Sequence, residues 1–167
     1  MTSEQITKSG ILIIDPQANM AALVADMLRS LGRRDIREVY DANLAQVELR
    51  RRPFELVIID DGLTKPGAVE IVRRLRADTD SINRLAPIIM MSAAPDATRI
   101  AAARDAGVTE FLRKPFAANH LKTRLESIAA NPRPFVEAGG YAGPDRRRQA
   151  REVGTADRRK HHTPDQT

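Results

Sequence analysis

Five short apolar runs between residues 10 and 113 constrain the fold of this chain more than any other feature. They are GILIID (10–15), IREVY (36–40), FELVIID (54–60), APIIMMS (86–92) and TEFLR (109–113). Continuous apolar runs of this length are typical of strands that are buried on both faces of a parallel sheet. Segments with helical spacing alternate with them, at 19–32, 43–51, 68–77, 96–107 and 118–130. This alternation predicts a doubly wound α/β fold with a five-stranded parallel sheet.

Polar side chains follow four of the predicted strands at their carboxyl ends. In sheets of this kind the functional crevice lies at that edge. Carboxylate oxygens suit a divalent cation, and a hydroxyl and a lysine suit a phosphoryl group. The pattern therefore predicts phosphoryl chemistry on a carboxylate, at a site built from Asp15, Asp60, Asp61, Ser92 and Lys114.

The order of these motifs resembles the CheY-like receiver domain of two-component response regulators, over about residues 9 to 130. The strand LIID ends in Asp15, LVIID ends in Asp60, MMSA contains Ser92, and FLRKPF supplies Phe111 and Lys114. The resemblance implies a flavodoxin-like fold and a signalling module that is not an enzyme. It also implies that Asp60 is the phosphoacceptor for a histidine kinase. Lys114 would pair with it, Ser92 would bind the phosphate, and Phe111 would be the switch aromatic.

The same resemblance implies a magnesium site made by Asp15, Asp60 and the backbone carbonyl of Gly62. One departure weakens it, because Pro16 stands where the family has a second acid. Asp61 is a further carboxylate, but adjacent side chains on an extended strand point to opposite sides, so we expect it to face away. Asp60 is then either a working acceptor or part of a pseudo-receiver in which acids and lysine only neutralise one another.

A change of composition follows the last predicted helix. Residues 131–145, NPRPFVEAGGYAGPD, contain three prolines and three glycines, which predicts a linker. We therefore divide the chain into a receiver domain (1–130), a linker (131–145) and an arginine-rich tail (146–167). The tail has too few apolar side chains to fold alone, so it is expected to be disordered or ordered by a ligand.

The charges of the C-terminal segment point to a small ligand. Residues 131–167 carry eight basic residues against five acidic ones, a net charge of +3 within a total of +5. Acids interrupt the arginines, which disfavours nucleic-acid binding by simple charge neutralisation. Arginine forks onto guanine or phosphate and stacks on bases, and a carboxylate accepts the N–H donors of guanine. These groups predict cyclic di-GMP as the ligand, bound by Tyr141, Asp145, Arg146, Arg147, Arg148, Arg151, Asp157, Arg158 and Arg159.

A receiver with such a tail resembles the Cle-type CheY-like effectors of cyclic di-GMP, which are linked to the flagellar motor switch. That resemblance implies docking on a protein partner through the face built by residues 96–130. The chain has no cysteine, and its first residues show neither a signal peptide nor a membrane span, so we expect a cytoplasmic protein. Three alternatives stay open: a receiver driven by phosphorylation, a basic-tailed nucleic-acid adaptor, and a structural scaffold.

Overall fold

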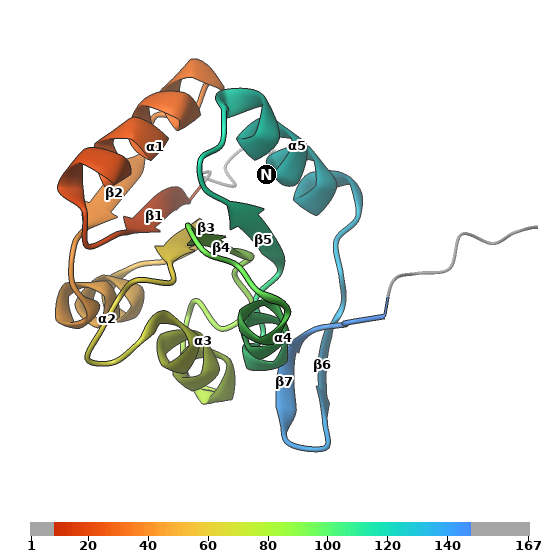
Figure 1. The fold of residues 1–167 in the computed structure, drawn as a ribbon. Helices are drawn as coiled ribbons and strands as arrows, with labels where there is room; N and C mark the ends of the chain where they lie inside the picture. The colour runs from red at the N-terminus through yellow and green to blue at the C-terminus, as the bar shows by residue number, and fades with distance from the viewer. Residues whose placement is uncertain (1–8, 148–167) are drawn as a thin grey trace, which may run out of the picture.

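A five-stranded parallel sheet forms the centre of the computed structural model, which describes residues 9–147 (Figure 1). The strand order is β2-β1-β3-β4-β5, with a crossover between each pair of successive strands. This confirms the doubly wound fold predicted from the apolar runs. The strands are β1 (Gly10–Ile14), β2 (Ile36–Val39), β3 (Phe54–Asp60), β4 (Ile88–Ser92) and β5 (Glu110–Arg113).

Five helices cover the two faces of this sheet. Residues of α1 and α5 pack in one apolar cluster with one face of the strands, and residues of α2, α3 and α4 pack in a second cluster with the other face (Figure 1). Their bounds are α1 (Ala18–Ser30), α2 (Ala42–Arg51), α3 (Ala68–Ala77), α4 (Ala97–Ala106) and α5 (Ala118–Ala130). Among the described residues, no helix is both long and apolar enough to cross a membrane.

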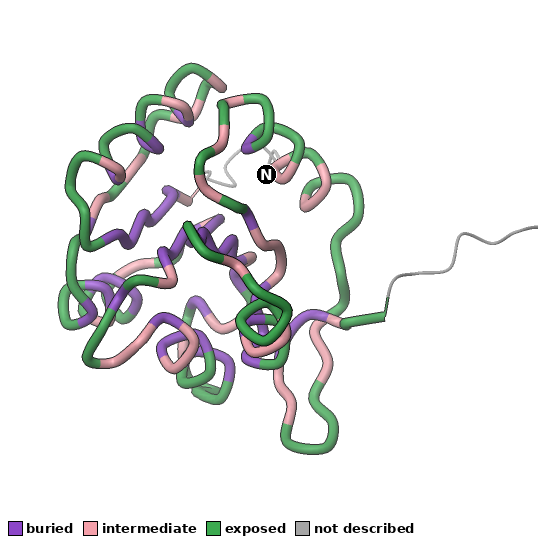
Figure 2. The backbone as a smooth tube through the Cα atoms, in the orientation of Figure 1, coloured by how far each residue is buried: buried purple, intermediate pink, exposed green. Residues whose placement is uncertain are grey.

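Burial is deepest in the inner strands of the sheet, and Figure 2 shows the buried middle of the molecule. Every residue of β1 and β4 is buried, because helices cover both faces of each strand. The edge strand β2 has only one buried residue, Val39. This difference explains why the inner strands read as continuous apolar runs while IREVY contains charges.

Local signals set several helix ends. Gly32 and Gly107 have φ angles of 86° and 109°, the left-handed conformation in which glycine ends a helix without strain. The carboxylates of Asp41 and Asp96 accept hydrogen bonds from the backbone amides of Leu44 and Arg99, and so cap α2 and α4.

The segment after α5 corrects the predicted linker. Residues 135–144 form an antiparallel hairpin of β6 (Phe135–Ala138) and β7 (Tyr141–Pro144). Gly139 and Gly140 make the turn with positive φ angles of 57° and 79°, which is the geometry of a tight two-residue hairpin turn. The linker prediction was wrong here because it counted prolines and glycines, whereas a Gly-Gly pair between two short strands is a hairpin signal.

The hairpin packs against α3 and α4 (Figure 1). The ring of Phe135 packs against two guanidinium groups, with its centre 4.9 Å from that of Arg84 and 5.9 Å from that of Arg76. Arg84 also forms an ion pair with Glu137. On β7, a side chain at Gly143 would begin only 2.9 Å from the Cα atom of Gly107. Two glycines therefore let β7 approach the end of α4.

Arg76 is the buried anchor of this contact. Arg76 is only 2% exposed, and this burial lowers the pKa of its guanidinium to about 10. It nevertheless donates hydrogen bonds to the carbonyl oxygens of Gly107 and Arg84, the first over 3.0 Å. Because these carbonyls belong to the end of α4 and to the loop before β4, Arg76 joins three parts of the molecule beneath the hairpin.

Candidate functional site

Three of the predicted site residues converge at the carboxyl edge of the sheet. Lys114 follows β5, and its Nζ lies 2.6 Å from Oδ1 of Asp60 and 3.0 Å from Oδ2 of Asp15. The side chain of Asp15 is fully buried, and those of Asp60 and Lys114 are 11% and 12% exposed. The topology explains this convergence, since β1, β3 and β5 run parallel and end at the same edge.

The lysine carries its charge firmly in this setting. Burial of Lys114 opposes the charge, but hydrogen bonds with Asp60 and Asp15 outweigh that effect and raise the pKa of its amine. Two carboxylates thus share one ammonium group at neutral pH. This arrangement holds the Asp60 carboxylate in an ion pair with Lys114.

The loop after β3 fixes the position of the Asp60 carboxylate. Oδ2 of Asp60 accepts a 2.9 Å hydrogen bond from the backbone amide of Gly62. A Cβ atom at position 62 would lie 2.7 Å from that same oxygen, so a larger residue here would require the Asp60 carboxylate to shift. Glycine leaves room for the carboxylate in this position.

The donor set at this edge fits a weakly held Mg²⁺. Asp15, Asp60 and the Gly62 carbonyl are hard oxygen ligands of the kind that Mg²⁺ prefers. Oδ1 of Asp15 accepts a hydrogen bond from the amide of Gln17, on the far side of Pro16. Within residues 9–147 no group of three acidic or histidine side chains is placed to hold a metal ion, and Pro16 adds no carboxylate to this edge. Mg²⁺ would have two carboxylates, both already paired with Lys114.

Ser92 lies at this edge but is engaged elsewhere. It is fully buried, and its hydroxyl donates a hydrogen bond to Oδ2 of Asp61. The guanidinium of Arg99, in the first turn of α4, binds the same oxygen over 3.2 Å. As expected, Asp61 does not join the group around Lys114. The contact with Ser92 and the part played by Arg99 were not predicted, because they depend on the register of β3 and β4.

Phe111 lies in β5, half-buried and packed against the α2–α3–α4 side of the core. Beside it is a hollow of about 140 Å³ lined by Ile100, Ala103 and Arg104 of α4. A neighbouring space is therefore present, into which an aromatic ring could rotate. Its role as a switch stays a prediction.

A second group of predicted residues meets at the hairpin. Tyr141, Asp145, Arg146 and Arg147 line a hollow of about 430 Å³, together with Val136 and Ala138. The Arg146 guanidinium lies 4.3 Å from the centre of the Tyr141 ring. Burial raises the pKa of the Tyr141 hydroxyl, which donates a hydrogen bond to the carbonyl of Pro144.

Arg146 also contacts the main domain. Its guanidinium donates a 2.6 Å hydrogen bond to Oδ1 of Asp105, in the last turn of α4. Sequence reasoning placed Arg146 in the ligand site but did not find Asp105. The other predicted ligand residues lie outside the described part of the chain: Arg148, Arg151, Asp157, Arg158 and Arg159.

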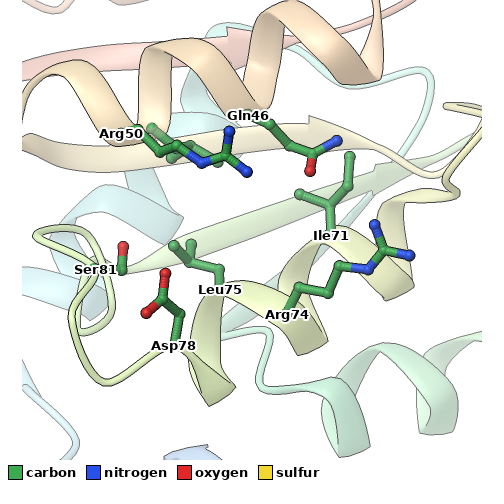
Figure 3. Close-up of a pocket in the computed structure, with 8 residues that line it drawn as sticks. Gln46, Arg50, Ile71, Arg74, Leu75, Asp78 and Ser81 are labelled. Carbon is green, nitrogen blue, oxygen red and sulfur yellow. The ribbon is translucent and has the colours of Figure 1, made fainter.

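A further hollow lies between α2 and α3 (Figure 3). It has a volume of about 110 Å³, and Gln46 and Arg50 face Arg74, Asp78 and Ser81 across it. None of the predicted site residues lines it. It is too small for a nucleotide and shares no residue with the carboxyl edge of the sheet.

Comparison with known proteins identifies the domain. The response regulator receiver domain family matches residues 11–126. The chain belongs to this family. It is 31% identical over 118 residues to the chemotaxis protein CheY-3 of Vibrio cholerae, covering 71% of this chain and 89% of that protein. It is 30% identical to CheY of Pseudomonas aeruginosa, covering 71% of this chain and 94% of the relative.

Solved receiver structures agree with this assignment. The receiver domain of the sensor histidine kinase PA1611 of P. aeruginosa, with magnesium in its active site cleft, has a TM-score of 0.63 at 26% identity, over 71% of this chain and 94% of that one. V. cholerae CheY4 has a TM-score of 0.65 at 20% identity, over 72% and 98%, and shares the fold. Receiver domains are signalling modules, and CheY-like receivers interact with histidine kinases and with motor or effector proteins.

Proposed function

We propose that this receiver is a cytoplasmic signalling protein that binds cyclic di-GMP with its arginine-rich C-terminal segment. In the bound state it would then dock on a protein partner such as the flagellar motor switch. The observation that carries the proposal is the hollow of about 430 Å³ beside the hairpin, where Tyr141, Asp145, Arg146 and Arg147 come together. An aromatic ring, two guanidinium groups and a carboxylate are the groups that recognise a guanine nucleotide.

The hairpin supports this proposal because it gives the binding segment a fixed base. Phe135 and Gly143 hold β6 and β7 against α3 and α4, so Arg146 and Arg147 begin the tail at a defined place. Arginines on a rigid element lose less conformational freedom when they bind than arginines on a free chain.

The contact between Arg146 and Asp105 supports a link from ligand to partner. A nucleotide that takes the Arg146 guanidinium would remove a 2.6 Å hydrogen bond from the last turn of α4. Helix α4 belongs to the face of residues 96–130 on which we expect the partner. That face has a hollow of about 140 Å³ beside Phe111, and Ile100 is 43% exposed there.

Calorimetric titration of cyclic di-GMP into the full chain tests the proposal, with GTP and a short DNA duplex as controls. We expect tight binding that is lost in Arg146→Ala/Arg147→Ala. The matched control Arg73→Ala/Arg74→Ala removes two arginines from α3 that are each 58% exposed. Equal affinity for DNA with a steep salt dependence would instead favour the nucleic-acid adaptor. No binding of any of the three would overturn the proposal.

Docking is tested by titrating a flagellar motor switch protein into the full chain with and without cyclic di-GMP. We expect binding only with the nucleotide, and its loss in Ile100→Glu, which places a charge on the proposed face. Leu23→Glu, on α1 and 46% exposed, is the control.

Phosphorylation of Asp60 is a second candidate function, favoured by the position of Lys114 between Asp15 and Asp60. A phosphoryl group on Asp60 would add negative charge beside a lysine that already carries a firm positive charge. Mg²⁺, if bound by Asp15, Asp60 and the Gly62 carbonyl, would neutralise phosphoryl oxygens. Incubation with acetyl phosphate and Mg²⁺, read by intact-mass spectrometry, should add one phosphoryl group to the chain and none to Asp60→Asn. Equal labelling of both proteins would exclude Asp60 as the acceptor.

A further inference from the structure

Asp61 accepts the hydrogen bond of the Ser92 hydroxyl, the group that we expect to bind a phosphoryl group on Asp60. Strands β3 and β4 pair with Asp60 opposite Met91, and the backbone amide of Asp61 binds the carbonyl of Met91 over 2.9 Å. This register brings Asp61 beside Ser92. A serine hydroxyl has a single proton to donate, and the Ser92 hydroxyl donates it to Asp61.

The same carboxylate oxygen is bound by α4. Arg99 lies in the first turn of that helix and reaches Oδ2 of Asp61 over 3.2 Å. The Asp61 side chain is 16% exposed, whereas that of Arg99 is 56% exposed. One buried hydroxyl and one exposed guanidinium therefore share a single oxygen, and Asp61 connects the end of β4 to the start of α4.

The charged groups at this edge thus fall into two sets. Lys114 forms ion pairs with Asp15 and Asp60, and Arg99 forms an ion pair with Asp61. An anion attached to Asp60 would compete with Asp61 for Ser92, since both are acceptors for one proton. It would also add negative charge next to an existing carboxylate.

We propose that Asp61 is an internal competitor for the Ser92 hydroxyl, and that its displacement frees the first turn of α4 from the end of β4. This inference rests on the acceptor function of Asp60. In the free protein, Asp61 holds Ser92 and α4 in one arrangement. When an anion on Asp60 takes the Ser92 hydroxyl, Asp61 keeps Arg99 but loses its bond to β4, so the first turn of α4 is no longer tied to the end of that strand.

Beryllofluoride, which attaches to a carboxylate as a phosphoryl analogue, is the probe, used with Mg²⁺ and the full chain. Asp61→Asn removes the competing charge and keeps the side-chain shape. We expect it to bind beryllofluoride about tenfold more tightly, because apparent affinity falls with the fraction of chains that cannot bind. The matched control Asp26→Asn, on α1 and 73% exposed, should bind as the parent does.

Two further variants separate competition from the loss of a charge alone. The first is Asp61→Asn in a Ser92→Ala background, which should lose most of its gain, because the hydroxyl for which the two acceptors compete is absent. The second is Ser92→Ala alone, which should bind beryllofluoride no more tightly than the parent, although Asp61 has lost one partner. A full gain of Asp61→Asn without Ser92 would show that the removed charge alone matters, and would overturn the proposal.

Hydrogen exchange without any anion gives an independent readout. Exchange of the amides at residues 97–100 should be faster in Asp61→Asn than in Asp26→Asn. If no variant binds beryllofluoride, the acceptor function of Asp60 fails. The exchange rates then test separately whether Asp61 holds the first turn of α4. Unchanged exchange would then overturn the role of Asp61 in holding α4.

Discussion

The carboxyl edge of the sheet and the C-terminal hairpin are built by different means. At the edge, Lys114 joins two acids that lie 45 positions apart at the ends of parallel strands, and ion pairs and hydrogen bonds to carboxylates make the contacts. At the hairpin, an aromatic ring packs against two arginines, and two glycines allow close approach of the backbones. The edge is therefore held by polar groups around buried carboxylates, whereas the hairpin is held by close packing of an aromatic ring and glycines.

Helix α4 contacts both regions. Its first turn reaches Asp61 through Arg99, and its last turn reaches Arg146 through Asp105. A change at either region would therefore act on the same helix. The following changes test how far the two regions differ, from the largest expected effect to the smallest.

Lys114→Met should have the largest effect on stability. It leaves Asp15 and Asp60 buried without their shared cation, and breaking a buried pair in this way costs about 3–5 kcal/mol. Urea unfolding at pH 7, followed by circular dichroism, measures the change. Lys122→Met on α5, where the side chain is 60% exposed, should change the free energy of unfolding little. Equal effects of the two variants would show that the edge is not held by this lysine.

Arg76→Met should destabilise the hairpin side by about 2–3 kcal/mol, because it leaves two buried carbonyls without donors. Those carbonyls belong to Gly107 and Arg84. The same unfolding experiment with Arg73→Met, one turn away and 58% exposed, provides the control. If Arg76→Met lowers the free energy of unfolding no more than Arg73→Met does, the two carbonyls must find other donors, and Arg76 is not the anchor.

Gly143→Ala should cost about 1–3 kcal/mol, as added atoms in a tightly packed contact usually do. The new Cβ atom would lie 2.9 Å from the Cα atom of Gly107. Ala138→Ser adds one atom to an exposed position of the same hairpin and should be nearly neutral. Faster hydrogen exchange across β6 and β7 in Gly143→Ala would locate the loss, while unaltered exchange there would contradict a tight glycine contact.

Alkaline pH should produce the smallest effect and should act on both regions. Folding raises the pKa of Lys114 and of Tyr141, so the folded state holds these protons more tightly than the unfolded one. Their contribution to stability is complete below the unfolded pKa values, about 10 for tyrosine and 10.4 for lysine, and is lost as pH rises through the folded values. Urea midpoints between pH 8 and 11 measure this decline, and Tyr141→Phe should make it shallower.

The sequence predicted the carboxyl edge more completely than the hairpin, for a physical reason. Parallel strands end at one edge, so Asp15, Asp60 and Lys114 could be brought together from strand positions alone. The pairing of Arg99 with Asp61 could not be predicted, because it depends on where the first turn of α4 packs beside the end of β3. At the hairpin, a Gly-Gly signal was present in the sequence and was outweighed by the count of prolines and glycines.

The sequence by itself determined the order of strands and helices, the edge that carries the polar residues and the family resemblance. These features follow from local periodicity and from the residues at strand ends. Each of them can be inferred from a single segment of the chain. Only the tertiary structure decided that Arg76 is buried beneath the hairpin, that Arg146 contacts Asp105, and that Ser92 is held by Asp61. Each of these contacts joins residues 31 to 41 positions apart, and it forms only when packing and register have fixed both partners.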